Sequence, residues 1–288
     1  MPDRPGATEL SITAPDGVEL AGEDSDPARP GIPIVLLHGL TATRRYVVMG
    51  SRALERSGYR VIGYDARGHG RSTAAPDPAA YAYADLTRDL EAVLDGLGLE
   101  RAVLAGASMG AHTAVRFALR HPERVSALGL ITPSFDPDLP TDAAAFTGWN
   151  ALAHGLRERG VEGFVDAYDF SELPAEWRGT VEQVVRQRLA AHEHPEAVAD
   201  ALEVVPSSRP FERIVELADI EVPTVIVASR DEADPGHPLA VGERYARTIP
   251  TARLVVEDPG VGGHLIRSPI AWQGGQLSKV LAELAVYT

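Results

Sequence analysis

The chain has 288 residues, 44% hydrophobic and 24% charged, which is typical of a folded globular protein and argues against wholesale disorder and against collagen-like and coiled-coil architectures. Its 27 basic and 41 acidic residues give a formal net charge of −14, which disfavours nucleic acid and anionic membranes as partners. Cysteine is absent, so disulfides, thiolate metal sites and cysteine nucleophiles are excluded.

The N-terminal segment MPDRPGATELS has no apolar stretch typical of a secretory signal, and no run reaches the ~18 apolar residues of a membrane span. We therefore expect a soluble, cytoplasmic protein without a membrane partner. Lys279 is the one lysine among the basic residues, an arginine bias that indicates a bacterial genome. The sequence leaves the oligomeric state open, a homo-oligomer included.

The first predicted element is a hairpin over residues 8–22, where apolar and polar positions alternate around the turn Asp16-Gly17. Short apolar runs typical of buried strands then alternate with helical patterns. In chain order these are strand 32–37, helix 45–57, strand 59–64, helix 82–97, strand 102–105, helix 109–120 and strand 125–131. This alternation predicts an α/β fold with a mostly parallel central sheet flanked by helices.

The pattern changes over residues 135–213, where helical stretches follow one another without a convincing buried strand. Strand patterns return afterwards, so this segment is predicted to be a helical cap, or lid, inserted into a core domain of residues 1–134 and 214–288. The returning elements are strand 223–228, helix 239–248, strand 253–256 and helix 270–285.

The sequence Gly106-Ala107-Ser108-Met109-Gly110 fits the pattern G-x-S-x-G directly between a predicted strand and a predicted helix. Small neighbours and glycines allow a tight turn that exposes a serine, and the N-terminus of the helix directs free N–H groups at the reaction centre. Ser108 is therefore a candidate nucleophile, which requires a base and an acid that orients the base.

Two downstream segments offer such groups, each after a predicted strand. The segment 229–238 contains Asp231, Glu232, Asp234 and His237, and the segment 257–264 ends in His264. We expect His237 to be structural, and surface positions for the histidines in helical segments. These are His112, His121, His154, His192 and His194.

With these segments the chain resembles the α/β-hydrolase family over nearly everything except the helical insert. Members of the family carry the acid in D-x-x-x-P, and the spacing from Asp234 to Pro238 matches it. The loop looks longer than usual, so Asp231 and then Glu232 remain alternatives. The resemblance implies that His264 is the base and Asp234 the acid.

The segment 34–40, a strand followed by His38-Gly39-Leu40, resembles the strand and H-G of the same family. The resemblance implies that the backbone N–H groups of Leu40 and Met109 form the oxyanion hole. His38 is expected to hold the loop through its ring. The segment 65–72, DARGHGRS, resembles the family's D-x-R-G-x-G-x-S loop, whose role is structural.

Candidate substrate-binding residues carry less signal. Arg44 and Arg45 open a predicted helix beside the site and could contact a substrate carboxylate, with salt bridges to acidic residues as the alternative. Three cap aromatics are further candidates, with packing of the cap as the alternative: Phe146, Trp149 and Tyr168. No metal is expected, since His192-x-His194 has no third ligand, and no cofactor, since nucleotide-binding motifs are missing.

Together these features predict a serine hydrolase that cleaves a carboxylic ester or lactone of a small molecule through an acyl-serine intermediate. The same triad would also serve a carbon–carbon bond hydrolase, an amidase or a cofactor-free perhydrolase, and the cap would decide between them. A different class is a hydrolase-fold protein that binds a ligand without catalysis.

Overall fold

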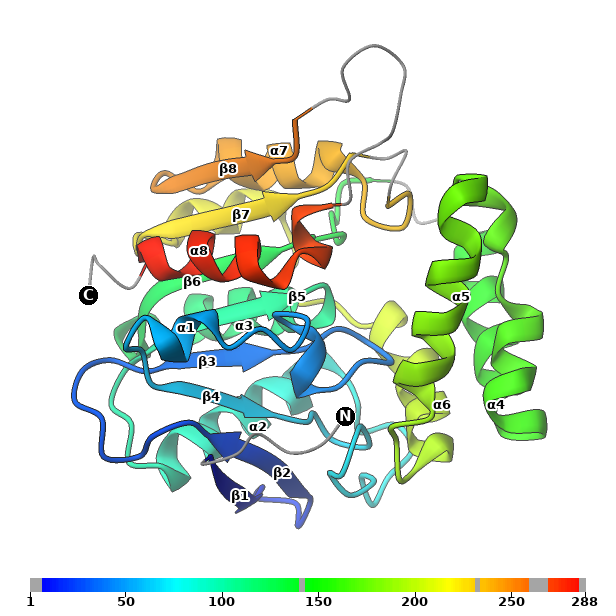
Figure 1. Ribbon diagram of the computed structural model, residues 1–288, viewed down its shortest axis with the longest axis horizontal. Helices are drawn as coiled ribbons and strands as arrows, with labels where there is room; N and C mark the ends of the chain where they lie inside the picture. The colour runs from blue at the N-terminus through cyan, green and yellow to red at the C-terminus, as the bar shows by residue number, and fades with distance from the viewer. Residues whose placement is uncertain (1–6, 140–142, 231–233, 259–268, 285–288) are drawn as a thin grey trace.

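The computed structural model describes residues 7–139, 143–230, 234–258 and 269–284 (Figure 1). Its centre is an eight-stranded sheet of strand order β1-β2-β4-β3-β5-β6-β7-β8, in which the strands from β4 to β8 are parallel and β1 and β2 form an antiparallel edge. The strands are β1 Thr8–Thr13, β2 Glu19–Asp24, β3 Ile34–Leu37, β4 Val61–Tyr64, β5 Ala102–Ala107, β6 Val125–Ile131, β7 Thr224–Ala228 and β8 Ala252–Val256. The predicted fold class is confirmed.

Helices cover both faces of the sheet, as the runs of fully buried residues in β3 to β7 require. One apolar cluster joins the sheet to α2, α3 and α7, and a second joins the opposite face to α1 and α8. The bounds of these helices are α1 Ala53–Arg56, α2 Tyr83–Gly96, α3 Met109–Arg120, α7 Leu239–Thr248 and α8 Gly274–Leu284.

The helices between β6 and β7 lie beyond the carboxyl ends of the parallel strands, to the right of the sheet in Figure 1. They are α4 Ala143–Ala167, α5 Ala175–Leu189 and α6 Pro195–Val204. Their apolar side chains form a separate cluster around Leu156, Phe164 and Val198. No strand lies within the described part of residues 135–213, in agreement with a helical insertion, whose limits stay a prediction.

The predicted hairpin at the amino end of the described chain is confirmed, since Thr8 pairs with Asp24 and Thr13 with Glu19 around a turn in which Gly17 has a φ of 90°. The continuous helix predicted over 45–57 is wrong. Only a 3-10 turn, Arg44–Tyr46, and the short α1 form there, because Met49 and Gly50 adopt φ angles of 48° and 70°, which no right-handed helix accommodates.

The DARGHGRS segment is a buried polar loop, as expected. The carboxylate of Asp65 accepts hydrogen bonds from the backbone N–H groups of Arg44 and Arg71. Arg67 pairs through two nitrogens with buried Asp89 at 2.7 and 2.6 Å. The bond from Arg44 fixes the loop after β4 against the loop after β3, which carries part of the candidate site, and the bonds to Asp89 fix the same loop against α2.

Within the described residues, no helix combines the length and the apolar character needed to cross a lipid bilayer.

Candidate active site

Ser108 occupies the turn between β5 and α3 with a strained backbone. Its φ and ψ are 50° and −113°, a region that costs a residue with a side chain about 1–3 kcal/mol and that is concentrated at functional sites. The backbone N–H of Ser108 donates to the carbonyl of Ile131 at 2.9 Å, which ties the turn to β6.

The two glycines of the motif are required by close packing. A Cβ on Gly106 would lie 2.2 Å from the carbonyl carbon of Gly110, and a Cβ on Gly110 would lie 2.2 Å from the carbonyl oxygen of Leu37. Both contacts are with backbone, which cannot move aside. The spacing G-x-S-x-G therefore follows from the geometry of a helix that begins directly beneath a strand end.

The loop after β3 lies against the serine. A Cβ on Gly39 would approach the Cβ of Ser108 to 3.4 Å, so the two segments are in contact. The carbonyl of Gly39 is held from one side by the ring Nδ1 of His38 at 2.8 Å and by the N–H of Ala42 at 3.0 Å. Because a peptide is planar and trans, the N–H of Leu40 points to the other side. The expectation that His38 holds this loop is confirmed.

Among the residues that the structure describes, no group accepts a hydrogen bond from the backbone N–H of Leu40 or of Met109. Met109 is the first residue of α3, where N–H groups lack partners within the helix. Two free donors beside one serine could bind an oxygen that gains negative charge.

The loop after β7 carries a carboxylate that is already bonded to an imidazole. Oδ1 of Asp234 accepts a hydrogen bond from Nδ1 of His237 at 2.9 Å, and within the described residues its Oδ2 has no bond. Burial lowers the pKa of His237, but the adjacent carboxylate outweighs it and raises the pKa overall. Three predicted site residues lie outside the described residues: Asp231, Glu232 and His264.

Arg44 and Arg45 are both engaged by core carboxylates. The Arg44 guanidinium forms a buried ion pair with Asp65, and Nη2 of Arg45 lies 3.9 Å from the carboxylate of Glu23. This is the salt-bridge alternative that the sequence left open, so neither arginine is placed in the site proposed below.

The three cap aromatics differ in position. Trp149 is 36% exposed on α4, and Phe146 on the same helix is half-buried. Tyr168 is half-buried, stacks on Phe164 at a centroid distance of 6.1 Å and contacts the tilted ring of Phe170 at 4.5 Å. Of the three, only Tyr168 interacts electrostatically with Arg188 on α5.

Arg188 on α5 is a residue that the sequence analysis missed. The residue is half-buried, its Nε is buried without a hydrogen-bond partner, and no ion pair of its guanidinium is found among the described residues. Burial lowers the pKa of Arg188, while Tyr168, Tyr46 and Asp234 raise it. The sequence signal was available, because Arg188 continues the apolar helical spacing of Val181 and Val185.

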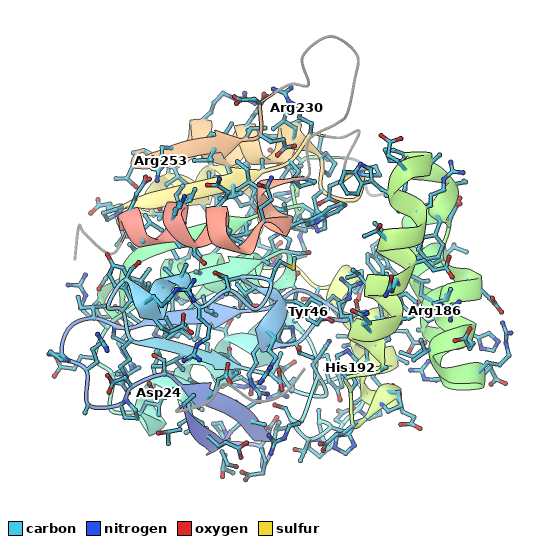
Figure 2. The ribbon with its side chains drawn as sticks, viewed as in Figure 1. Asp24, Tyr46, Arg186, His192, Arg230 and Arg253 are labelled. Carbon is cyan, nitrogen blue, oxygen red and sulfur yellow. The ribbon has the colours of Figure 1, made fainter. Side chains whose placement is uncertain are left out.

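The expectation of surface positions is wrong for His112 and His192. His112 is buried, and its Nε2 accepts hydrogen bonds from the N–H groups of Ser134 and Phe135, both at 3.1 Å. His192 bonds two core loops through both ring nitrogens and lies with Tyr46 where cap and sheet meet (Figure 2). Long-range partners, invisible in a helical pattern, cause both differences.

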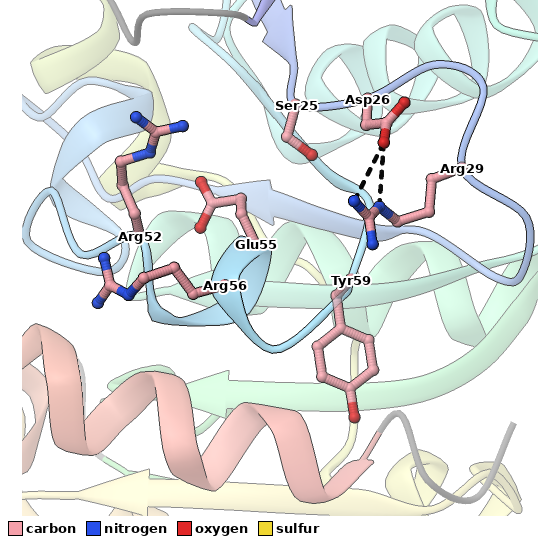
Figure 3. Close-up of a pocket in the computed structure, with 7 residues that line it drawn as sticks. All are labelled: Ser25, Asp26, Arg29, Arg52, Glu55, Arg56 and Tyr59. Atoms are coloured by element: carbon pink, nitrogen blue, oxygen red, sulfur yellow. Dashed lines mark hydrogen bonds and ion pairs between the residues drawn. The ribbon is translucent and has the colours of Figure 1, made fainter.

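A depression of about 410 Å³ lies near the amino ends of the parallel strands, between α1 and the segment after β2 (Figure 3). It is lined by charged groups including Arg29, which pairs with Asp26 at 3.1 Å. Ligands of open α/β sheets bind at the carboxyl ends of the strands. Ser108 and the cap lie at that end, and we therefore place the candidate active site there.

Among the described residues, no three or more His, Asp or Glu side chains are arranged so that they could hold a metal ion.

Comparison with known proteins agrees with this architecture. A family model described as alpha/beta hydrolase fold matches residues 32–159. The chain is 32% identical over 255 residues to a 2-hydroxy-6-oxononadienedioate/2-hydroxy-6-oxononatrienedioate hydrolase of Burkholderia vietnamiensis, which covers 84% of each chain. It therefore belongs to the α/β-hydrolase fold family.

Two further relatives differ in the activity that their names state. A protein of Variovorax paradoxus named "Putative carbamate hydrolase RutD" is 32% identical over 204 residues, which cover 70% of this chain and 75% of that one. A thermophilic esterase from Thermogutta terrifontis, solved with malate bound, superposes with a TM-score of 0.76 at 25% identity and covers 96% of this chain and 97% of that one. Relatives of comparable sequence identity thus support hydrolase activity but do not determine the substrate.

Proposed function

We propose that this protein is a serine hydrolase that cleaves a carboxylic ester or lactone of a small molecule with an anionic group. The observation that carries the proposal is the strained backbone of Ser108, with φ at 50°, between two glycines that have no room for a Cβ. Strain of this size persists only where the surroundings impose it, and here it exposes a hydroxyl beside two free N–H donors.

In the proposed reaction, Oγ of Ser108 attacks the carbonyl carbon and its proton passes to the imidazole of His264. The N–H groups of Leu40 and Met109 bind the oxyanion. The imidazolium then protonates the leaving alcohol, and water hydrolyses the acyl-serine by the same steps. Asp234 orients the base, a role for which its Oδ2 is available beside the bond to His237.

Arg188 is the reason for proposing that the substrate carries an anionic group. Arg188 is half-buried, and its buried Nε has no hydrogen-bond partner, which is costly for a charged group, so binding an anion offsets that cost. Its charge acts on groups from the loop after β3, the cap and the loop after β7, namely Tyr46, Tyr168 and Asp234. These three segments all follow the carboxyl ends of parallel strands, which supports a place for Arg188 in the proposed site.

A second candidate is hydrolysis of a carbon–carbon bond in a vinylogous diketone. It is favoured by the Burkholderia vietnamiensis relative, whose name specifies a dioate, and by Arg188, which would hold a carboxylate of such a substrate. The same serine, base and oxyanion donors would be used.

The test is the Ser108→Ala variant on a panel of aryl esters, lactones, amides and a vinylogous diketone, with Ser207→Ala as the matched control. Ser207 is exposed, and its hydroxyl bonds only within its own helical segment. We expect Ser108→Ala to lose turnover and covalent labelling by a fluorophosphonate, and Ser207→Ala to retain both. Activity confined to the diketone would replace the ester proposal with the second candidate, and turnover retained by Ser108→Ala would refute both.

A further inference from the structure

We propose that His192, in the turn between α5 and α6 of the cap, is a positioning residue that holds the oxyanion loop in its active form. The inference rests on the proposed function, because it assigns a role in the hydrolysis at Ser108. It identifies the hydrogen bond through which the cap acts on the catalytic centre.

The two ring nitrogens of His192 have different and fixed roles. Nδ1 lies 2.8 Å from the backbone nitrogen of Gly70, whose N–H can only donate, so Nδ1 must be unprotonated. Nε2 lies 3.0 Å from the carbonyl oxygen of Thr41, which can only accept, so Nε2 carries the proton. The imidazole is thus neutral, and one tautomer satisfies both loops.

Thr41 has an unfavourable backbone conformation that the hydrogen bond from His192 can stabilise. It is buried and has a φ of 63°, in the left-handed region that favours glycine. It occupies the third position of the turn in which the N–H of Ala42 donates to the carbonyl of Gly39. That carbonyl belongs to the same peptide unit as the N–H of Leu40, so the turn decides where this donor points.

The cap also packs directly on the two oxyanion residues. Met109 and Leu40 share an apolar cluster with Ala197, Ala201 and Val205, which lie on or directly after α6. Leu40 additionally packs against the main apolar cluster of the cap. The cap thus holds the loop after β3 in two ways: it covers the apolar side chain of Leu40, and His192 donates a hydrogen bond to the backbone carbonyl of Thr41.

The bond to Gly70 is a separate anchor. The N–H of Glu193 donates to the carbonyl of Gly70 at 2.9 Å, so the cap turn and the loop after β4 exchange two hydrogen bonds there. A purely structural role for His192 would depend on this anchor, whereas the proposed role depends on the bond to Thr41. The two roles can be separated because each uses a different ring nitrogen.

The experiment compares His192→Gln, His192→Asn and His192→Ala. The amide nitrogen of glutamine lies near the position of Nε2 and can donate to Thr41, whereas the amide of asparagine lies near Nδ1 and can accept only from Gly70. We expect kcat for an aryl ester to fall about tenfold or more in the asparagine and alanine variants, with KM within about threefold, because a misdirected oxyanion donor weakens only transition-state binding. The glutamine variant should remain within about threefold of the native kcat.

Thermal unfolding of each variant measures the Gly70 anchor independently. The proposal is overturned if glutamine loses as much kcat as alanine, if asparagine rescues kcat, or if KM alone changes. If the Ser108→Ala variant, with His192 unchanged, keeps its turnover, the proposed function is refuted instead. Failure of the proposed function can therefore be distinguished from failure of the role proposed for His192.

Discussion

Replacing Arg188 should change which substrates the protein prefers. The assay compares two aryl esters of equal chain length, a hexanoate and a monoester of adipic acid, which differ by a terminal carboxylate. In Arg188→Met the stem of the side chain remains and the charge is removed. We expect kcat/KM for the adipate ester to fall, and kcat/KM for the hexanoate to stay within about threefold.

The size of the loss follows from the surroundings of Arg188. Hydrogen bonds to a charged group contribute about 1.5–3 kcal/mol, which corresponds to roughly 10–150-fold in kcat/KM. Asp234 lies within electrostatic reach of Arg188 and would repel a substrate carboxylate, so we expect the lower part of that range, about 10–50-fold. Stability should not fall, because the buried Nε of Arg188 has no partner to lose.

Arg186 provides the matched control two residues earlier on α5. It forms ion pairs with Glu162 and Glu182 on the outer surface of the cap, so Arg186→Met should leave the ratio of the two kcat/KM values unchanged. An equal loss for both esters in Arg188→Met, or the same selectivity change in Arg186→Met, would refute the assignment of Arg188 to an anionic group.

Two further predictions concern stability. Gly110→Ala should lower the free energy of unfolding by about 3 kcal/mol or more in urea titrations, because its Cβ would meet the Leu37 carbonyl oxygen at 2.2 Å. Gly148→Ala, with nothing within 4 Å of its Cβ on α4, should be neutral or gain up to ~1 kcal/mol, and equal losses in the two would contradict the packing argument. For His112, burial lowers the pKa from 6.5 to about 3, so the unfolded chain binds the extra proton and stability falls as the pH decreases from about 6.5 towards 3. His112→Gln should reduce the pH slope of the unfolding free energy by about 1.4 kcal/mol per pH unit near pH 5, and an unchanged slope would show that His112 does not titrate in this way.

The elements that the sequence predicted well are those whose cause is local. A strand such as Val125–Ile131 is buried along its whole length, and a run of apolar residues is sufficient to indicate it. The turn at Ser108 could also be predicted from the sequence, because close backbone contacts restrict its flanking positions to glycine. The helix expected over 45–57 failed because left-handed φ angles at Met49 and Gly50 leave no trace in hydrophobic spacing.

The side chains that link cap and core were not predictable for a different reason. His192 lies in a turn, where a polar residue is normally solvated. Arg188 continues the apolar spacing of its helix, which indicates burial but does not show which groups surround the side chain. Their surroundings come from distant loops: Thr41 is 151 positions from His192, and Asp234 follows a different strand altogether. The proposed nucleophile is indicated by five consecutive residues, whereas the roles proposed for Arg188 and His192 depend on contacts between the cap and distant loops. The relatives that match this chain carry names as different as esterase, carbamate hydrolase and dioate hydrolase, so the shared fold alone does not determine the substrate.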